Sequence, residues 1–347
     1  DNPTASFDNP LQLKTKGFIF SGNLGRLQRI PLLLKSIEKY KAKGLNDKHA
    51  NYLAMIENID QNLGRLTAFL KKRELEENTI LVFINDNGVT EGLDVYNAGM
   101  RGCKATCWEG GTRAMSFWRW PSHWTPHTAN NLTAHIDLLP TLCELAGAKI
   151  PESMQAELQG FSLTPLLEAN KDIDWPHDKR HLFHHVGRWP SGLAASHKYA
   201  MGAVRQGNYL LLRSVPCDDP ECAKYNSQCT TLRAVRKGLK SATYAKGTAQ
   251  YHWGVTPADR WALYDVDKDP GCRNDIAFEN PERVVAMATN YDKWWDSQYP
   301  VMLARGGDKG DPNASKNASS RTRQHAAKMA IQKKADEATK GKTLKIK

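Results

Sequence analysis

The most constraining feature of this 347-residue chain is an apolar run that ends abruptly in small polar residues. Residues 79–84 have the sequence TILVFI, and Asn85, Asp86, Asn87 and Gly88 follow directly. A nearly continuous apolar run of this length is typical of a strand that is buried on both faces of a parallel sheet. Ligands bind open α/β sheets beyond the carboxyl ends of their strands, so a site is expected at these polar residues.

The elements around this run predict a layered α/β domain. A long amphipathic helix is expected, because apolar side chains recur at spacings of three and four residues. These side chains are Leu53, Ile56, Ile59, Leu63, Leu66 and Leu70. Asn46 or Asp47 can cap this helix, so it is expected to begin there. A strand at 115–120 and a helix at 135–146, ended by Gly147, follow the run. This order of helices and strands is typical of α/β layers.

After about residue 180 the pattern changes to short predicted strands between turn residues, at 199–205, 208–213 and 261–266. A last helix is predicted from Pro281 to about Trp295, with Asn280 as its cap. We therefore expect a smaller α+β subdomain with an antiparallel sheet. The predicted segments are an unassigned stretch at 1–37, the α/β domain at 38–180, the α+β subdomain at 181–300 and a basic tail at 301–347 that is expected to be disordered.

The net charge of +11 raises the question of nucleic-acid binding, because a basic face binds phosphates by releasing counterions. Residues 305–347 hold 12 Lys/Arg against 4 Asp/Glu, a charge of +8, which leaves +3 for the rest. We therefore expect no nucleic-acid partner, and a solvated tail rather than an anchor for anionic polymers. No stretch reaches the about 20 apolar residues of a membrane-spanning helix, so no membrane span is expected.

The seven cysteines are too irregularly spaced for a disulfide framework. Cys217, Cys222 and Cys229 cluster in a polar insertion, and Cys272 follows further on. Their gaps mostly exceed those of structural zinc sites. Free thiols, one or two local disulfides and a zinc site stay open as alternatives.

A glycine-punctuated loop, residues 97–113, has the sequence NAGMRGCKATCWEGGTR. Its glycines let the backbone approach a ligand closely, and Arg101, Lys104 and Arg113 supply positive charge. The oxygen donors of Asp86 and Asn87 suit a hard cation such as calcium or magnesium. Asp-Asn-Gly is also a common turn, and 97–113 could be a basic surface loop.

Several ordered segments resemble the sulfatase family of the alkaline-phosphatase-like superfamily. They are MIENIDQNLGRL (55–66), ENTILVFINDNG (77–88), MRGCKATCWEGGTR (100–113), HIDLLPTLCELAG (135–147) and LYDVDKDPGCRND (263–275). The resemblance covers about residues 38–300. It implies the C-terminal half of an alkaline-phosphatase-like α/β sandwich, followed by the smaller subdomain.

The resemblance also implies roles for single positions. Asp86 and Asn87 match the family's late pair of metal ligands, for calcium with magnesium as the alternative. Lys104 matches the lysine that contacts the sulfate and is the catalytic candidate. The segment from Glu109 to Arg113 shapes the loop. The metal would polarise a sulfate oxygen, and the lysine would offset charge in the transition state.

The chain departs from the family pattern in one important respect. Sulfatases oxidise a Cys or Ser, in the pattern Cys/Ser-x-Pro-x-Arg, to formylglycine, whose hydrate is the nucleophile, and no residue here has that context. The family's early Asp-Asp metal pair and its Pro-His segment are missing too. We therefore expect a catalytically incomplete chain that is the C-terminal portion of a longer protein.

His184, His185 and Arg188 are predicted to line a substrate pocket, because His and Arg bind sulfated or acidic sugars well; an interdomain contact is the alternative. The predicted function is a sulfuric ester hydrolase acting on a sulfated small molecule, such as an aryl sulfate, or on a sulfated polysaccharide. The alternatives are a phosphodiesterase or phosphonate hydrolase of the same superfamily, and a non-catalytic protein that binds sulfated polymers. The resemblance suggests a secreted, periplasmic or lysosomal location.

Overall fold

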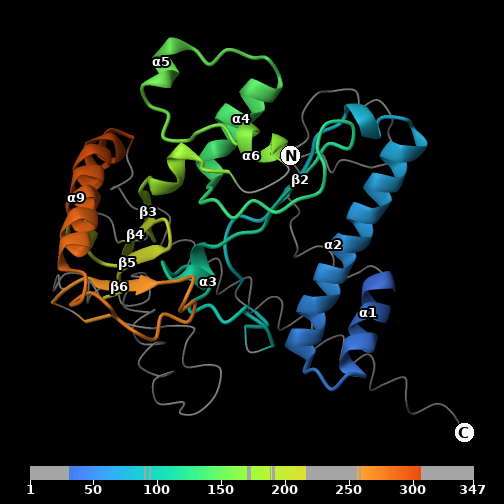
Figure 1. Ribbon diagram of the computed structural model, residues 1–347. Helices are drawn as coiled ribbons and strands as arrows, with labels where there is room; N and C mark the ends of the chain where they lie inside the picture. The colour runs from blue at the N-terminus through green and yellow to red at the C-terminus, as the bar shows by residue number, and fades with distance from the viewer. Residues whose placement is uncertain are drawn as a thin grey trace, which may run out of the picture. The chain divides into compact units, whose positions relative to one another are not determined.

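The computed structural model describes residues 31–89, 91–93, 95–169, 173–187, 189, 192–215, 256–257 and 259–305. The chain divides into two compact units, one up to Glu76 and one from Glu77 onward, and each is described by itself (Figure 1). Residues 1–30, Arg188, the Cys217–Cys229 cluster and the basic tail from 306 lie outside the described residues. The predictions made for them stay predictions.

The first unit holds two packed helices, α1 (Pro31–Lys41) and α2 (Asp47–Lys72). Asn46 caps α2 as predicted, because its side-chain oxygen accepts a hydrogen bond from the His49 N–H at 2.9 Å. Of the predicted apolar face only Leu70 is buried, at 5% exposure. Ala50 and Ala54 are fully buried, whereas Ile56 of the predicted face is 45% exposed. Small side chains let neighbouring backbones approach closely, so we attribute the burial of this face to the packing of α1.

In the second unit, β1 (Leu81–Ile84) pairs with β2 (Ser116–Arg119). The pairing is antiparallel, with Phe83 opposite Phe117, and all four residues of β1 are only half-buried. The prediction of a strand buried on both faces of a parallel sheet is therefore wrong for the described residues. The chain after the 97–113 loop returns along β1 in the opposite direction, and Phe117 stays 63% exposed.

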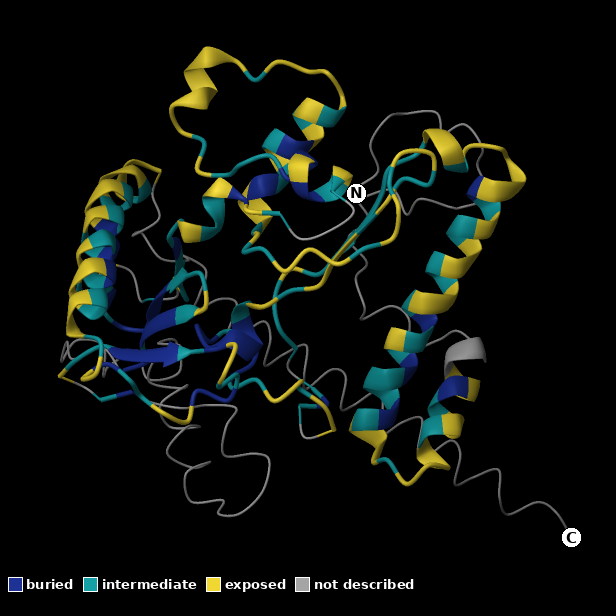
Figure 2. Ribbon diagram, in the orientation of Figure 1, coloured by how far each residue is buried: buried dark blue, intermediate teal, exposed yellow. Residues whose placement is uncertain are grey.

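A four-stranded antiparallel sheet follows, in the spatial order β3 (Leu182–His185), β4 (Gly202–Gln206), β5 (Tyr209–Arg213) and β6 (Ala262–Asp265). Strands β4, β5 and β6 confirm the predicted antiparallel sheet, with ends that differ by at most three residues from the prediction, and β3 was not predicted. Side chains alternate between the two faces of such a sheet, and both faces are covered here, as the dark-blue strands of Figure 2 show.

One face of this sheet packs on α9 (Pro281–Ala304). Its apolar cluster consists of Val204, Leu211, Leu263, Ala277, Met287, Tyr291 and Trp295. Gly202 has no side chain because a Cβ there would lie 2.5 Å from the Tyr291 hydroxyl oxygen. Helix α9 runs past its predicted end, and Asn280 does not cap it with its side chain, which donates instead to the Ile276 carbonyl at 3.0 Å.

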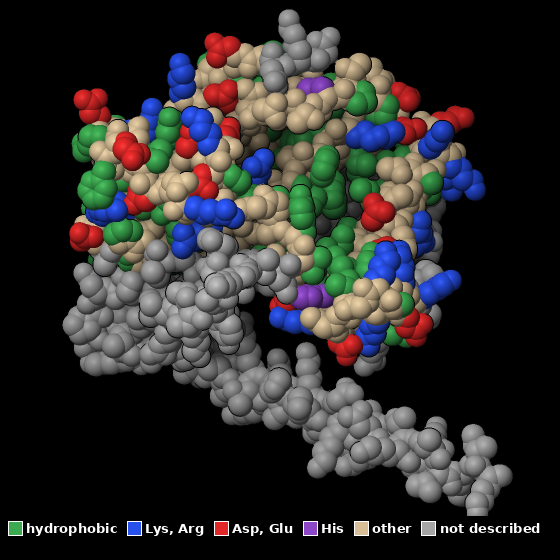
Figure 3. Space-filling view, turned by 60° about the horizontal axis from the view of Figure 1, so that its bottom comes forward, with side chains coloured by type: hydrophobic (Ala, Val, Ile, Leu, Met, Phe, Trp, Pro, Cys, Tyr) green, Lys and Arg blue, Asp and Glu red, His purple; other side chains and the backbone are tan. Residues whose placement is uncertain are grey.

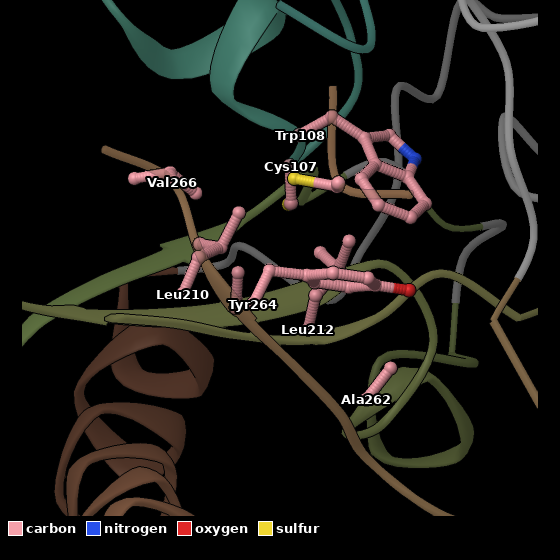
Figure 4. Close-up of a cluster of buried hydrophobic side chains, with 9 residues drawn as sticks. Cys107, Trp108, Leu210, Leu212, Ala262, Tyr264 and Val266 are labelled. Carbon is pink, nitrogen blue, oxygen red and sulfur yellow. The ribbon is translucent and has the colours of Figure 1, made fainter. Parts of the chain in front are cut away.

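The other face packs on residues of the 97–113 loop. Cys107 and Trp108 lie over Leu210, Leu212 and Tyr264, as Figure 4 shows. The Trp108 side chain is fully buried, and its ring centroid lies 5.6 Å from that of Tyr264. This cluster fastens the loop to the sheet, so the antiparallel sheet supports the end of the α/β part.

The remaining elements are short. They are η3 (Glu76–Asn78), α3 (Glu109–Thr112), η4 (His135–Asp137), α4 (Leu138–Leu145), α5 (Glu152–Gln155), α6 (Thr164–Glu168), η5 (Pro176–Lys179) and η6 (Ala195–His197). The helix predicted at 135–146 is thus confirmed as η4 followed by α4. Among the described helices, none is long and apolar enough to cross a bilayer. On the face drawn in Figure 3, Lys and Arg side chains are interspersed with Asp and Glu.

Asp137 is the polar centre of the segment between β2 and β3. Its fully buried carboxylate accepts hydrogen bonds from the Arg180 guanidinium at 2.6 and 2.7 Å. It also accepts from the backbone N–H groups of Ala134 at 2.7 Å and Phe161 at 2.9 Å. A buried charge is tolerated when it is paired and hydrogen-bonded in this way. Through these bonds Asp137 joins η4 to the backbone at Phe161 and to Arg180, which directly follows η5.

We expect Asp137→Ala to lower the free energy of unfolding by about 3–5 kcal/mol, because the buried Arg180 guanidinium loses its charged partner. Urea unfolding of the full chain measures this loss. Glu144→Ala, an exposed acidic residue on α4, is the matched control and should change stability by less than about 0.5 kcal/mol. Equal stability of the two variants would contradict the central role of Asp137.

His185 is held neutral inside the aromatic cluster beside α9. Its ring centroid lies 5.4 Å from that of Trp189 and 5.1 Å from that of Trp295. Its Nε2 donates to the His197 carbonyl at 2.8 Å, and its Nδ1 accepts from the Gly187 N–H at 2.9 Å. Burial lowers the pKa of His185 from 6.5 to about 4. Protonation of Nδ1 would break the bond from Gly187.

We expect the stability of the chain to fall as the pH drops from 6.5 toward about 4. In this interval His185 binds a proton in the unfolded chain and not in the folded one, so acid favours unfolding. Melting temperatures at about pH 7 and about pH 4.5 measure the decline, and His185→Gln should make it smaller. His123→Gln, at an exposed position, is the control. If His185→Gln and the parent chain decline equally, the neutral buried state is wrong.

Candidate functional site

The polar turn after β1 is organised by Asn85. Its side-chain Nδ2 donates to the Asn87 carbonyl at 2.7 Å, which closes the turn over Asp86. Its Oδ1 accepts from the Met115 N–H at 2.5 Å, which ties the turn to the start of β2. Asn side chains often bond backbone groups two residues on in this way. The Asp86 carboxylate is therefore presented outward from a fixed turn, with 81% of its side chain exposed.

The turn is joined to the 97–113 loop by close backbone contacts. The Gly88 N–H donates to the Gly111 carbonyl at 3.0 Å, and the Lys104 N–H donates to the Val89 carbonyl at 2.9 Å. A Cβ at Gly88 would collide with the Gly110 carbonyl oxygen. Only glycine fits this approach.

These contacts bring Lys104 and Asp86 together. The Lys104 Nζ lies 3.9 Å from the Asp86 Oδ2, well within the distance over which two charges interact at ordinary salt. Their side chains are 47% and 81% exposed. An exposed ion pair contributes only about 0–1 kcal/mol. Both groups are therefore available to a ligand at small cost.

Arg101, near the start of the 97–113 loop, fixes the loop through two contacts. Its guanidinium lies 3.9 Å from the Trp108 ring centroid and donates to the Cys272 carbonyl at 3.1 Å. The Cys107 Sγ donates to the Met201 carbonyl at 2.9 Å, at the start of β4. Burial raises the pKa of the Cys107 thiol to about 12, so it stays protonated and packs as an apolar group.

Glu109, which belongs to the 97–113 loop, is buried between two arginines. Its carboxylate oxygens lie 3.6 Å from the Arg113 Nη1 and 4.0 Å from the Arg205 Nη1. Glu109 is 6% exposed. Because this carboxylate faces the sheet rather than the Asp86 turn, it fits the structural role that the resemblance implied.

The structure places the predicted substrate-pocket histidines on opposite faces of β3. His184 shares the Glu109 side of the sheet, and its Nδ1 is buried with no hydrogen-bond partner. Burial, with Arg205 and His135 nearby, lowers the pKa of His184 to about 4. His185 faces α9, and both its ring nitrogens bond the backbone. A ligand-binding role for His185 stays a prediction, and Arg188 lies outside the described residues.

Two positioning residues were not predicted. Asn85 was part of the noted polar run without a role, and its side-chain bonds are described above. His135 was part of the noted 135–147 segment, and its Nε2 donates to the Asn85 carbonyl at 2.8 Å. The partners of these bonds are backbone groups, and the Met115–Asn85 and His135–Asn85 bonds join residues distant in sequence, so no sequence pattern indicates those two bonds. The Asn in a turn was the one available signal.

The donor set at the turn fits part of a calcium site. Asp86 and Asn87 offer the hard oxygen ligands that calcium prefers, but calcium takes six to eight of them. Within the described residues, no group of three or more His, Cys, Asp or Glu side chains converges on one point. Asp86 and Asn87 alone are therefore fewer donors than a calcium ion takes.

Two family models match the chain. A model described as Sulfatase matches residues 3–148, and a model described as N-sulphoglucosamine sulphohydrolase, C-terminal, matches residues 104–220. The two matches together span more than half of the chain and cover the Asp86 turn and the 97–113 loop. The first also includes most of the stretch 1–37, which the sequence pattern left unassigned.

Two curated relatives agree with these matches. A protein named Sulfatase from Formosa agariphila is 36% identical over 160 residues, which are 42% of this chain and 28% of that protein. Steryl-sulfatase from Mus musculus is 30% identical over 244 residues, which are 68% of this chain and 35% of that protein. The matched part of this chain thus spans about a third of its relatives' length.

The solved structure of Ps i-CgsB has a TM-score of 0.56 and 20% identity, and the match covers 85% of this chain and 52% of that chain. A second structure of that protein, in complex with k-i-k-neocarrahexaose, has a TM-score of 0.55. This likeness shows the fold and confirms the predicted alkaline-phosphatase-like α/β sandwich with a smaller α+β subdomain. The family models and the curated relatives show that the chain belongs to the sulfatase family.

Proposed function

We propose that this chain forms part of the active site of a sulfuric ester hydrolase that acts on a sulfated carbohydrate or an aryl sulfate. The observation that carries the proposal is the ion pair of Lys104 with Asp86, 3.9 Å apart on two segments joined by backbone hydrogen bonds. A lysine that binds a sulfate oxygen and a carboxylate that ligates a metal must lie this close together to act on the same ester group.

In the proposed site, Lys104 contacts a sulfate oxygen and stabilises negative charge there. Asp86 and Asn87 hold one side of a bound calcium ion, with magnesium as the alternative, which would polarise the ester. His184 lies on the Glu109 side of β3 with a buried Nδ1 that has no hydrogen-bond partner, and it is the histidine that we retain as a candidate for contacting the sugar. Arg188, four residues further along the chain, stays a proposed substrate residue.

The match to the C-terminal model of N-sulphoglucosamine sulphohydrolase supports a sulfated sugar as the substrate. Hydrated formylglycine supplies the nucleophile in sulfatases. Because the 347 residues contain no Cys/Ser-x-Pro-x-Arg pattern, we propose that catalysis needs groups beyond those in this sequence.

We expect Lys104→Ala to weaken the binding of 4-nitrophenyl sulfate about tenfold, because one charge-assisted hydrogen bond to the sulfate is lost. Titration calorimetry of the full chain with calcium measures the change. Lys149→Ala removes an exposed lysine beyond α4 and should leave the affinity unchanged. Unaltered binding by Lys104→Ala would show that this lysine does not contact sulfate.

Residues 1–347 alone are expected to show no turnover of 4-nitrophenyl sulfate in the presence of calcium. Catalytic groups that act as a unit are strongly non-additive, so a missing nucleophile removes nearly all of the rate. A chromogenic assay that compares the chain with Asp86→Ala tests this. Turnover that Asp86→Ala abolishes would place a nucleophile within these residues. Turnover of a phosphodiester but not of the sulfate ester would favour the phosphodiesterase alternative instead.

A further inference from the structure

A small open cleft lies at the end of β4 and β5, where Gln206, Gly207 and Asn208 form the turn between the two strands. Its volume is about 290 Å³, and its other lining residues are Asp178, Lys179, Tyr209 and Arg283. Ligand pockets generally begin at about 300 Å³. The cleft therefore has room for one sugar unit rather than for an oligosaccharide.

Arg283 gives the cleft an arginine that lacks an acceptor. Its guanidinium carbon lies 3.8 Å from the Tyr209 ring centroid, so it is held flat against the ring. Its Nε is buried, and among the described residues no hydrogen bond or ion pair involves this side chain. A guanidinium has five N–H donors, and leaving donors unpaired at a partly buried position costs free energy. An anion in the cleft would satisfy them.

Lys179 adds a second cation to the cleft. Its side chain is exposed and, within the described part of the chain, has no ion pair. The one carboxylate in the lining, Asp178, is already used: its two oxygens accept from the Asn131 Nδ2 and from the Leu132 N–H. Gln206 and Asn208 also line the cleft, and their side-chain amides suit hydroxyl groups, although the Gln206 Nε2 already donates to the Lys179 carbonyl at 3.2 Å.

This cleft is separate from the Asp86–Lys104 site. None of its lining residues belongs to that site or to the 97–113 loop. Its Tyr209 packs with the α9 cluster and its Arg283 lies on α9, whereas Cys107 and Trp108 of the loop pack on the opposite face of the sheet. A ligand unit bound here is therefore not the unit that reacts beside Lys104.

We propose that this cleft is a second binding site, for one acidic sugar residue that carries a sulfate ester. Arg283 and Lys179 bind the sulfate, and the amides of Gln206 and Asn208 bind ring hydroxyl groups. The choice of sulfate over another anion rests on the proposed function. Binding itself needs no hydrolysis, so it is tested independently of turnover.

The test is titration calorimetry of the full chain with glucose 6-sulfate, glucose and inorganic sulfate. We expect glucose 6-sulfate to bind more tightly than either of the others, and the affinity to fall with added salt. Lys179→Glu should weaken this binding by about tenfold or more, because it replaces an attractive charge by a repulsive one. Arg283→Met keeps an apolar stem on Tyr209, removes the donors and should weaken it similarly.

Lys293→Glu is the matched control, because it reverses an exposed lysine on the same helix α9 outside the cleft. It should change the affinity less than twofold. Equal binding of inorganic sulfate would overturn the sugar site. If neither cleft variant weakens glucose 6-sulfate binding, the cleft site is overturned. Loss in Lys104→Ala alone would overturn the cleft site and still support the proposed function. Loss in the cleft variants alone would support the cleft and count against Lys104.

Discussion

The close backbone approach between Gly88 and the Gly110–Gly111 pair is the constraint on which the candidate site depends. It brings the turn that carries Asp86 against the loop that carries Lys104, and the hydrogen bond from the Gly88 N–H to the Gly111 carbonyl holds it at 3.0 Å. A side chain at Gly88 would collide with the Gly110 carbonyl oxygen. The placement of the two charged groups thus follows from backbone geometry, and their own attraction contributes little because both are exposed.

The antiparallel sheet β3–β6 keeps the loop in place from the other side. Trp108 lies on one face of the sheet and Tyr291 on the other, and both side chains are fully buried. Burying a large aromatic side chain contributes roughly 1.5–3 kcal/mol. The subdomain therefore stabilises the α/β part directly, and the conformation of the 97–113 loop depends on the integrity of the sheet that the loop covers.

Local motifs predicted the parts of the molecule in which neighbouring residues determine the structure. The Asn46 cap and the end of the strand at Ile84 are of this kind. The direction of β1 was not predictable, because an apolar run of six residues carries no information about the partner strand. The buried face of α2 was missed because Ala50 and Ala54 give a weaker apolar signal than the leucines. The role of Asn85 was missed because its partners are backbone groups, which any residue offers.

The central claim is that Lys104 and Asp86 act on the same sulfate group. Anomalous diffraction tests this claim most directly. Crystals of the full chain would be soaked with calcium and selenate, a sulfate analogue whose selenium gives an anomalous signal. The account predicts a selenium peak whose oxygen lies about 3 Å from the Lys104 Nζ, on the side of the lysine that faces Asp86. A well-occupied selenate elsewhere, with none beside Lys104, would contradict it.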